Sequence, residues 1–290
     1  MGMKNSAALL AGLSAAAIWG GMYVVSKVVL EVVPPFALLT SRLILGFLTL
    51  WLVLAWRKSA PLTARQFWPL FGVGFIGYGI SLGFQFIGTK LSTAANGSLV
   101  TSATPALVLP FAALLLGEKI TPRRGLAILV ASLGVLAVID PRTADFSSAL
   151  FLGNLSLLGA ALTWALYSVL VRKVSPGIDL VLATAIFLLG GLPLTIPAGL
   201  WEISTQGLGV ITPGILGGIL FLGIIATALA MFLWNYAFAH LTASAASLTF
   251  FAQPLVGSLL GWFFLGEKIT PLFLLGGVLI GVGIVISAGE

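Results

Sequence analysis

Long runs of uncharged, mostly apolar residues fill the chain, and single charged residues or short polar clusters separate them. These runs are continuously rich in Leu, Ala and Gly, and they lack the alternation of apolar and polar positions that a membrane β-barrel needs. Most are as long as the roughly 20 residues that a helix needs to cross a bilayer. The pattern therefore predicts ten membrane-spanning helices, at residues 5–29, 34–56, 67–88, 93–116, 122–139, 149–171, 178–199, 212–238, 242–265 and 271–288.

The composition supports this prediction. Of the 290 residues, 59% are hydrophobic and 8% are charged, whereas about a quarter of the residues of a soluble domain are charged. Ten spans use most of the chain and leave no room for a soluble catalytic domain, a nucleotide-binding domain or a receptor ectodomain. The first run also has features of a signal peptide, but it continues to Val29, which favours a first span. We expect an all-α polytopic membrane protein.

The basic residues predict the orientation of the chain. With a cytoplasmic amino terminus, nine of them fall on the inner side and three, Lys90, Arg142 and Lys268, fall in outer loops. This bias is typical of cytoplasmic loops, so both termini should be inside. The net charge of +6 then reflects orientation and not a nucleic-acid partner. We expect a multi-pass protein of the cell membrane, which in a bacterium is the inner membrane.

The residues that carry enzyme chemistry are scarce. The chain has no Cys and one His, so it offers no disulfide, no thiolate ligand and no His-based metal site. Asp140, Asp145 and Asp179 fall in predicted loops, where they cannot serve an intramembrane protease or transferase. We expect no enzymatic activity, no metal and no cofactor.

The chain contains a duplication. Residues 116–122 and 265–271 both read Leu-Gly-Glu-Lys-Ile-Thr-Pro, 149 positions apart. At an offset of 145, Trp19 falls on Trp164. Seven identical consecutive residues with flanking matches indicate two repeats, at residues 1–145 and 146–290, within one membrane domain.

Each predicted repeat holds five helices, which is an odd number, so the second copy must enter the membrane from the opposite side. Inverted repeats are typical of transporters that open alternately to the two sides of the membrane, because the two halves can exchange conformations around a central site. Alternating access is therefore the favoured mechanism. A passive channel remains an alternative.

The same residues carry a family resemblance. Each half has a Trp in its first helix, a fourth helix rich in small residues with a Pro, and a Gly-Glu-Lys-Ile-Thr-Pro turn before the fifth helix. In these features the chain resembles the EamA-type transporters of the drug/metabolite transporter superfamily. The resemblance implies a ten-helix carrier with a central cavity, often an exporter of amino acids or related metabolites.

Polar and aromatic residues inside the predicted spans are the candidates for substrate binding, because hydrocarbon disfavours polar groups without partners. Interhelical packing and interfacial belts are the alternative roles of such residues. The duplicated tryptophans and the glutamines are favoured, together with polar residues on neighbouring helices. The predicted substrate contacts are Trp19, Tyr23, Tyr78, Gln85, Asn96, Trp164, Tyr167 and Gln253.

Five further residues are candidates for gating. Lys27 and Glu31 are four positions apart near the outer end of the first helix and can pair, and Arg42 lies close enough in the second helix to join them. Pro105 and Pro254 lie at matched positions inside the fourth and ninth predicted helices. Matched interruptions of this kind point to the binding region of a transporter.

The predicted function is export of amino acids or similar neutral or zwitterionic metabolites. Every Asp and Glu is assigned to a loop or a helix end, which favours uniport down the substrate gradient over ion coupling. A nucleotide-sugar or other phosphorylated-metabolite carrier is the alternative, and it would need cationic residues in the cavity. The expected partners are a small-molecule substrate and the lipid bilayer, and a monomer is the expected state.

Overall fold

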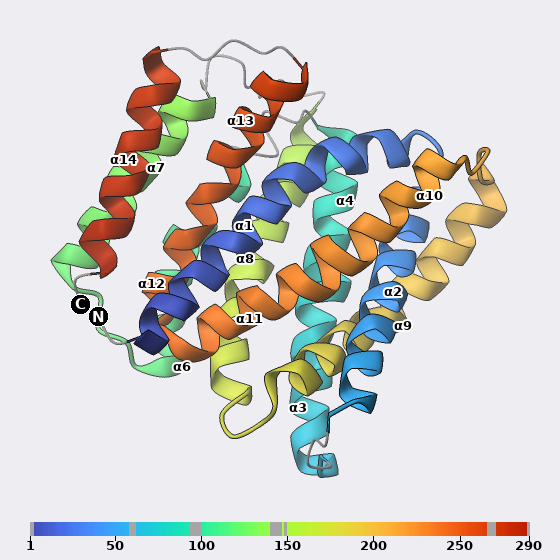
Figure 1. The fold of residues 1–290 in the computed structure, drawn as a ribbon, viewed down its shortest axis with the longest axis horizontal. Coiled ribbons are helices and arrows are strands. Elements are labelled where there is room, and N and C mark those ends of the chain that lie inside the picture. The colour runs from blue at the N-terminus through green and yellow to red at the C-terminus, as the bar shows by residue number, and fades with distance from the viewer. Residues whose placement is uncertain are drawn as a thin grey trace.

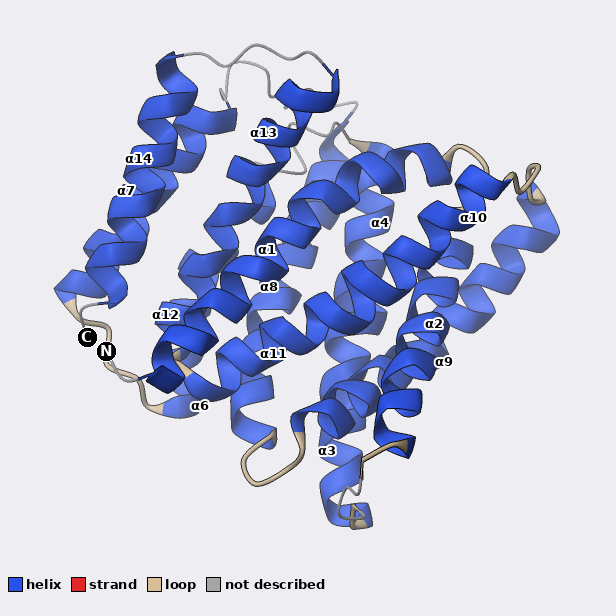
Figure 2. Ribbon diagram, in the orientation of Figure 1, coloured by secondary structure: helices blue, strands red, loops and turns tan. Residues whose placement is uncertain are grey.

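The computed structural model describes residues 3–57, 62–92, 100–139, 147, 150–265 and 271–288. Within these ranges the chain is helical and forms no strand (Figure 2). The first half contains α1 (Met3–Leu30), α2 (Pro35–Ala55), α3 (Ala64–Gly74), η1 (Phe75–Ser81), α4 (Leu82–Leu91), α6 (Thr104–Leu116) and α7 (Pro122–Ile139). The second half contains α8 (Phe151–Val174), α9 (Leu180–Gln206), α10 (Pro213–Leu220), η4 (Phe221–Leu229), α11 (Ala230–His240), α12 (Ala243–Leu248), η5 (Thr249–Phe251), α13 (Ala252–Leu265) and α14 (Pro271–Ala288).

These helices lie within the ten predicted apolar segments or extend them by a few residues, and the all-helical prediction is confirmed. Local chemistry explains several ends. The Asp179 carboxylate accepts hydrogen bonds from the first backbone N–H groups of α9, and Thr212 caps α10 in the same way ahead of Pro213. Five of the described helices are long and apolar enough to cross a membrane. The fold is that of a polytopic helical membrane protein.

Two long helices contain a π-helical stretch that the apolar pattern did not predict. η1 joins α3 to α4 and η4 joins α10 to α11, and the two stretches begin 146 positions apart. In η4 the Thr227 hydroxyl donates to the Leu222 carbonyl, five residues earlier, at 2.7 Å. In η1 a Cβ on Gly77 would lie 2.3 Å from the Tyr167 ring, so only glycine allows this approach. π-Helical turns are rare and frequently occur at functional sites.

Pro105 and Pro254, predicted to lie inside helices, lie instead at helix starts. Pro105 lies in the first turn of α6, and Pro254 lies in the first turn of α13, directly after the 3₁₀ turn η5. The matched interruptions therefore exist, but each break precedes its proline. The physical reason is that a helix tolerates proline in its first turn, where no intrahelical bond from its nitrogen is required.

The helices form two groups in space. α7 and α14 lie side by side along one edge (Figure 1), where a Cβ on Gly134 would lie 2.7 Å from the Gly276 carbonyl oxygen. The other helices surround a core that contains Trp19, Tyr78, Trp164 and Trp234. The two marked chain ends lie at the same end of the bundle (Figure 1).

Candidate functional site

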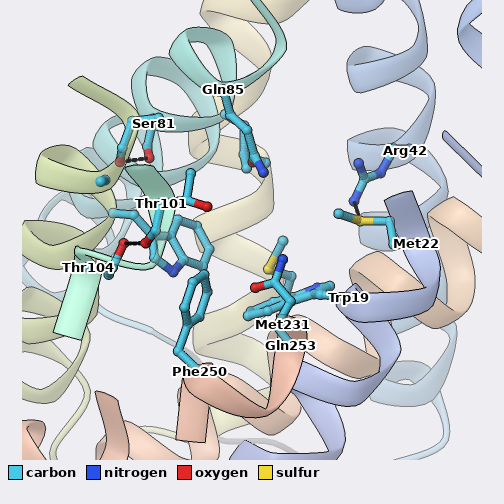
Figure 3. A pocket seen from close by; sticks show the side chains of 14 residues that line it. Trp19, Met22, Arg42, Ser81, Gln85, Thr101, Thr104, Met231, Phe250 and Gln253 are labelled. Carbon is cyan, nitrogen blue, oxygen red and sulfur yellow. Dashed lines mark hydrogen bonds between the residues drawn. The ribbon is translucent and has the colours of Figure 1, made fainter. Parts of the chain in front are cut away.

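A cavity lies between the two halves of the chain. It is lined from α1, α2, η1, α4, α6, α8, α11, η5 and α13, with Thr101 just before α6. The space measures about 40 Å³, which is room for about three water molecules. Its lining side chains, ten of which Figure 3 labels, are mainly apolar: Trp19, Met22, Arg42, Ser81, Leu82, Gln85, Thr101, Thr104, Ala160, Ala161, Trp164, Met231, Phe250 and Gln253.

A second, smaller cavity of about 20 Å³ adjoins the first, because Met22, Arg42 and Gln85 line both. It continues past Ser26 and Thr89 along α1 and α4, toward the carboxyl ends of both helices. The two cavities together mark a route from the middle of the bundle toward one of its ends.

Aromatic rings form one wall of the larger cavity. The Trp19 ring lies 5.8 Å from that of Trp164 and 6.3 Å from that of Phe250, measured between centroids. The Trp19 indole N–H donates to the Ala226 carbonyl in η4 at 3.0 Å. The Trp164 indole Nε1 is also buried, but it has no hydrogen-bond partner among the residues that the structure describes. The two predicted tryptophans thus share one wall and differ in their bonding.

Arg42 contributes a cation to the wall shared by both cavities, and its side chain is 2% exposed. Its Nε donates to the Thr227 hydroxyl at 3.2 Å, and its Nη2 lies 3.1 Å from the Met22 sulfur, the contact drawn in Figure 3. The Phe86 ring centroid is 5.8 Å from the guanidinium carbon. The sequence predicts Arg42 as part of an outer gate, and in the structure it lines both cavities; its role in gating stays a prediction.

The two predicted glutamines both line the larger cavity. Figure 3 shows their side chains extending into the space from α4 and α13. Gln253 is 7% exposed, and its side-chain oxygen is buried without a partner in the described part of the chain. An amide oxygen in this position can accept a hydrogen bond from a bound solute.

The predicted tyrosines Tyr78 and Tyr167 lie behind the aromatic wall and do not line the cavity. Their hydroxyl oxygens are 2.6 Å apart, and Tyr167 donates to the Asn235 side-chain oxygen at 2.7 Å. The Trp164 ring lies 4.9 Å from the Tyr167 ring. The pair is therefore placed to support Trp164 from behind, and direct solute contact stays a prediction for both tyrosines.

The remaining predicted residues are less informative. Asn96 lies outside the described residues, and the side chains of Tyr23 and Lys27 in α1 do so as well. Glu31 is exposed just after α1, so the predicted pair with Lys27 stays a prediction. No group of three or more His, Asp or Glu side chains able to hold a metal occurs within the described ranges.

Two carboxylates join the halves at helix ends, which sequence reasoning missed. Glu118, after α6, accepts the Ala243 N–H at 2.7 Å and the Ser244 hydroxyl at 3.0 Å, at the start of α12. Glu202 in α9 accepts the backbone N–H groups of Phe36 and Ala37 at 2.6 and 3.2 Å, at the start of α2. Negative charge is favourable at a helix amino terminus, and in both places it links one half to the other.

The apolar bundle and its internal cavity define a class of protein, the polytopic helical membrane proteins. The comparison with known families is more specific: the chain belongs to the EamA-like transporter family, whose model matches residues 6–139 and again residues 151–289. The predicted resemblance to EamA-type members of the drug/metabolite transporter superfamily is confirmed. Membership points to a transporter and away from an enzyme.

Similar proteins are themselves named as transporters. The chain is 24% identical to an uncharacterized transporter of Archaeoglobus fulgidus over 94% of both chains. It is 24% identical to the uncharacterized transporter YoaV of Bacillus subtilis over 95% of this chain and 94% of YoaV. A crystal structure of a protein with 21% identity superimposes with a TM-score of 0.82, over 97% of this chain and 96% of the other, which supports the fold.

Proposed function

We propose that the chain exports a small neutral or zwitterionic metabolite, such as an amino acid, by alternating access through this cavity. In this proposal residues 1–145 and 146–290 are inverted five-helix repeats, both termini are cytoplasmic, and the protein acts as a monomer in the cell membrane. The double match of the family model supports the repeats. Transport runs down the solute gradient, because the cavity lining that the structure describes contains no carboxylate to couple a proton or sodium ion.

A difference between equivalent hydrogen bonds carries the proposal. Trp19 and Trp164 are related by 145 positions, and Ala226 in η4 is related to Ile80 in η1 by 146. α1 packs against η4, and α8 packs against η1. Trp19 donates to the Ala226 carbonyl, whereas the Trp164 Nε1 has no partner in the described chain. Equivalent donors in the two halves are thus in different states.

A second pair of equivalent side chains also differs in its hydrogen bonds, and here the bond to another helix is made from η1 and not from η4. The Ser81 hydroxyl in η1 donates to the Ala160 carbonyl in α8 at 2.9 Å. Its equivalent, Thr227 in η4, donates instead within its own helix, to Leu222. The repeat relation pairs Thr227 with the Ala15 carbonyl in α1. In alternating access two similar halves exchange conformations, so the other state should contain the bonds Trp164 to Ile80 and Thr227 to Ala15.

The test is a matched pair of variants that act on opposite states. Trp19→Phe removes a bond of the present state, and Trp164→Phe removes the proposed bond of the other state. Each net hydrogen bond contributes about 1 kcal/mol, or about a fivefold change in the ratio of states. The reporter is Ser26→Cys, in the smaller cavity of a chain without cysteine, labelled by an impermeant thiol reagent in right-side-out vesicles without solute.

Labelling of Ser26→Cys should slow by up to about fivefold with Trp19→Phe and accelerate by up to a similar factor with Trp164→Phe. Trp201→Phe is the control, because Trp201 is 65% exposed on the surface and its substitution should change nothing. Equal shifts in the same direction for both cavity variants would contradict the exchange. Counterflow of radiolabelled amino acids in proteoliposomes, with and without an imposed proton or sodium gradient, tests the solute class and the uniport.

A further inference from the structure

The charge of the cavity narrows the kind of solute that it can hold. Arg42 lines both parts of the cavity, and no Asp or Glu is among the described side chains of either lining. A cation 2% exposed in an apolar wall acts over a low effective dielectric, so it attracts an anionic group strongly and repels a cationic one. Organic cations are therefore poor candidates, and a solute with a negative pole is favoured.

The fold itself does not require a charge at this position. The offset of 145 that relates Trp19 to Trp164 also relates Gly46 to Gly191 in the second helix of each half. The same offset places Phe187 opposite Arg42, and Phe187 is fully buried. An aromatic ring thus fills the equivalent position in the other half. Ionisable residues within a membrane are energetically costly. Arg42 has no charged counterpart in the second half, so it is a candidate for a functional role.

The contacts of Arg42 orient its guanidinium. The Thr227 hydroxyl accepts from Nε, the Met22 sulfur lies beside Nη2, and the Phe86 ring lies 5.8 Å away. These neutral groups come from three different helices and hold a planar donor that suits a carboxylate well.

The rest of the wall describes the body of the solute. Trp19, Trp164 and Phe250 offer aromatic faces, while the Trp164 Nε1 and the Gln253 oxygen are buried without partners among the described residues. Both side chains are 7% exposed. A solute that satisfies them presents one acceptor and one donor next to an apolar body.

We propose that Arg42 forms the subsite for a carboxylate of the transported solute, a small monocarboxylate with a hydrogen-bond donor and an apolar body. Apolar α-amino acids and the corresponding hydroxy acids fit this description. A phosphate dianion fits less well, because a single guanidinium would face two charges. This inference rests on the proposed transport function, of which it specifies the binding site.

The experiment measures binding of matched solutes to the purified full-length protein by calorimetry. The probes are alanine, leucine and phenylalanine, their carboxamides, their hydroxy-acid analogues and inorganic phosphate. At least one carboxylate series should bind, with its carboxamide at least about tenfold weaker, because a hydrogen bond to a charged group is lost. Binding of carboxamides as tight as that of the acids, binding of phosphate alone, or binding of no carboxylate would overturn the proposal.

Two substitutions test the residue itself. Arg42→Lys keeps the charge and should retain part of the preference for acids over carboxamides, whereas Arg42→Phe inserts the residue of the equivalent position and should abolish it. Size-exclusion chromatography of both variants checks folding. If Arg42→Phe does not fold, Arg42→Lys decides instead, since a bidentate site distinguishes the two cations. Loss of most of the acid preference in Arg42→Lys would support the subsite, and an unchanged preference would overturn it.

The two proposals fail in different ways. Carboxylate-selective binding without counterflow in proteoliposomes would refute transport and leave the subsite intact. Counterflow of a solute that responds equally in wild type and Arg42→Lys, with no preference for acids, would refute the subsite and leave transport intact.

Discussion

The Glu118 carboxylate holds two halves of the protein together at one end of the bundle, and its removal should both destabilise the fold and free that end. It bridges the end of α6 to the start of α12 through Ala243 and Ser244. Arg124 and Arg172 lie 3.5 and 3.8 Å from its oxygens. We compare Glu118→Gln, which keeps an acceptor for the cap, with Glu118→Ala, which does not.

The structure sets the expected size of the effect. A helix cap contributes about 1 kcal/mol, and the short Ala243 contact of 2.7 Å is charge-assisted. Each arginine pair contributes about 0.5 kcal/mol, because the Arg124 and Arg172 side chains are 13% and 33% exposed and solvent screens them. Glu118→Gln should therefore cost about 1 kcal/mol and Glu118→Ala about 2 kcal/mol. A change of about 1.4 kcal/mol in the free-energy difference between two states changes the ratio of their populations tenfold.

The assay combines thermal unfolding with labelling of Thr249→Cys in inside-out vesicles. Thr249 is fully buried in η5, directly after α12, where its side chain packs against Gly12 of α1, so its reaction reports loosening of α12 and η5 from the bundle. We expect faster labelling in the order wild type, Glu118→Gln, Glu118→Ala. Glu202→Gln is the matched control, since Glu202 caps α2 and its loss should lower stability without changing the reaction of Thr249→Cys. Unchanged labelling in Glu118→Ala, despite a lower melting temperature, would refute the prediction that Glu118 keeps this end of the bundle closed and would leave it a purely structural role.

Three further predictions follow from particular contacts. Tyr167→Phe removes a hydroxyl at the centre of a buried hydrogen-bond chain and should lower the free energy of unfolding by about 1–3 kcal/mol, measured in detergent. Gly77→Ala places a Cβ 2.3 Å from an aromatic ring and should reduce the yield of folded protein, whereas Gly72→Ala, with nothing within 4 Å, should not. In intact cells an impermeant thiol reagent should label Thr205→Cys and spare Lys173→Cys, both exposed positions; the reverse pattern would invert the predicted orientation.

The sequence predicted the helices well because charged and proline-containing connections interrupt the apolar runs. Asp179 caps the start of α9, and Thr212 caps the start of α10 ahead of Pro213, as the preference of these residue types for helix starts predicts. The duplicated Trp19 and Trp164 line one cavity in the structure, and the repeat relates them. Their contact with a substrate stays a prediction.

What the sequence did not predict depends on contacts between distant segments. Glu118 and Ala243 are 125 positions apart, and no local pattern reveals that one caps the helix of the other. The π-helical stretches have ordinary apolar composition, so their hydrogen bonds reflect packing against neighbouring helices. Helical spacing puts Tyr167, three residues after Trp164, on the same side of α8, but it cannot say which of the two lines the cavity.

The unpartnered Trp164 nitrogen connects the two proposals of solute binding and alternating access. A carboxylate or other acceptor of the solute would use the same N–H that the exchange assigns to the Ile80 carbonyl in the other state. Bound solute would therefore stabilise the present state by the free energy of one hydrogen bond, which changes the ratio of the two states about fivefold. The bond must then be released for the halves to exchange, which limits how tightly a solute can be held there. Weak binding at Trp164, with the main attraction at Arg42, would let the solute stabilise one state and still allow the two halves to exchange conformations.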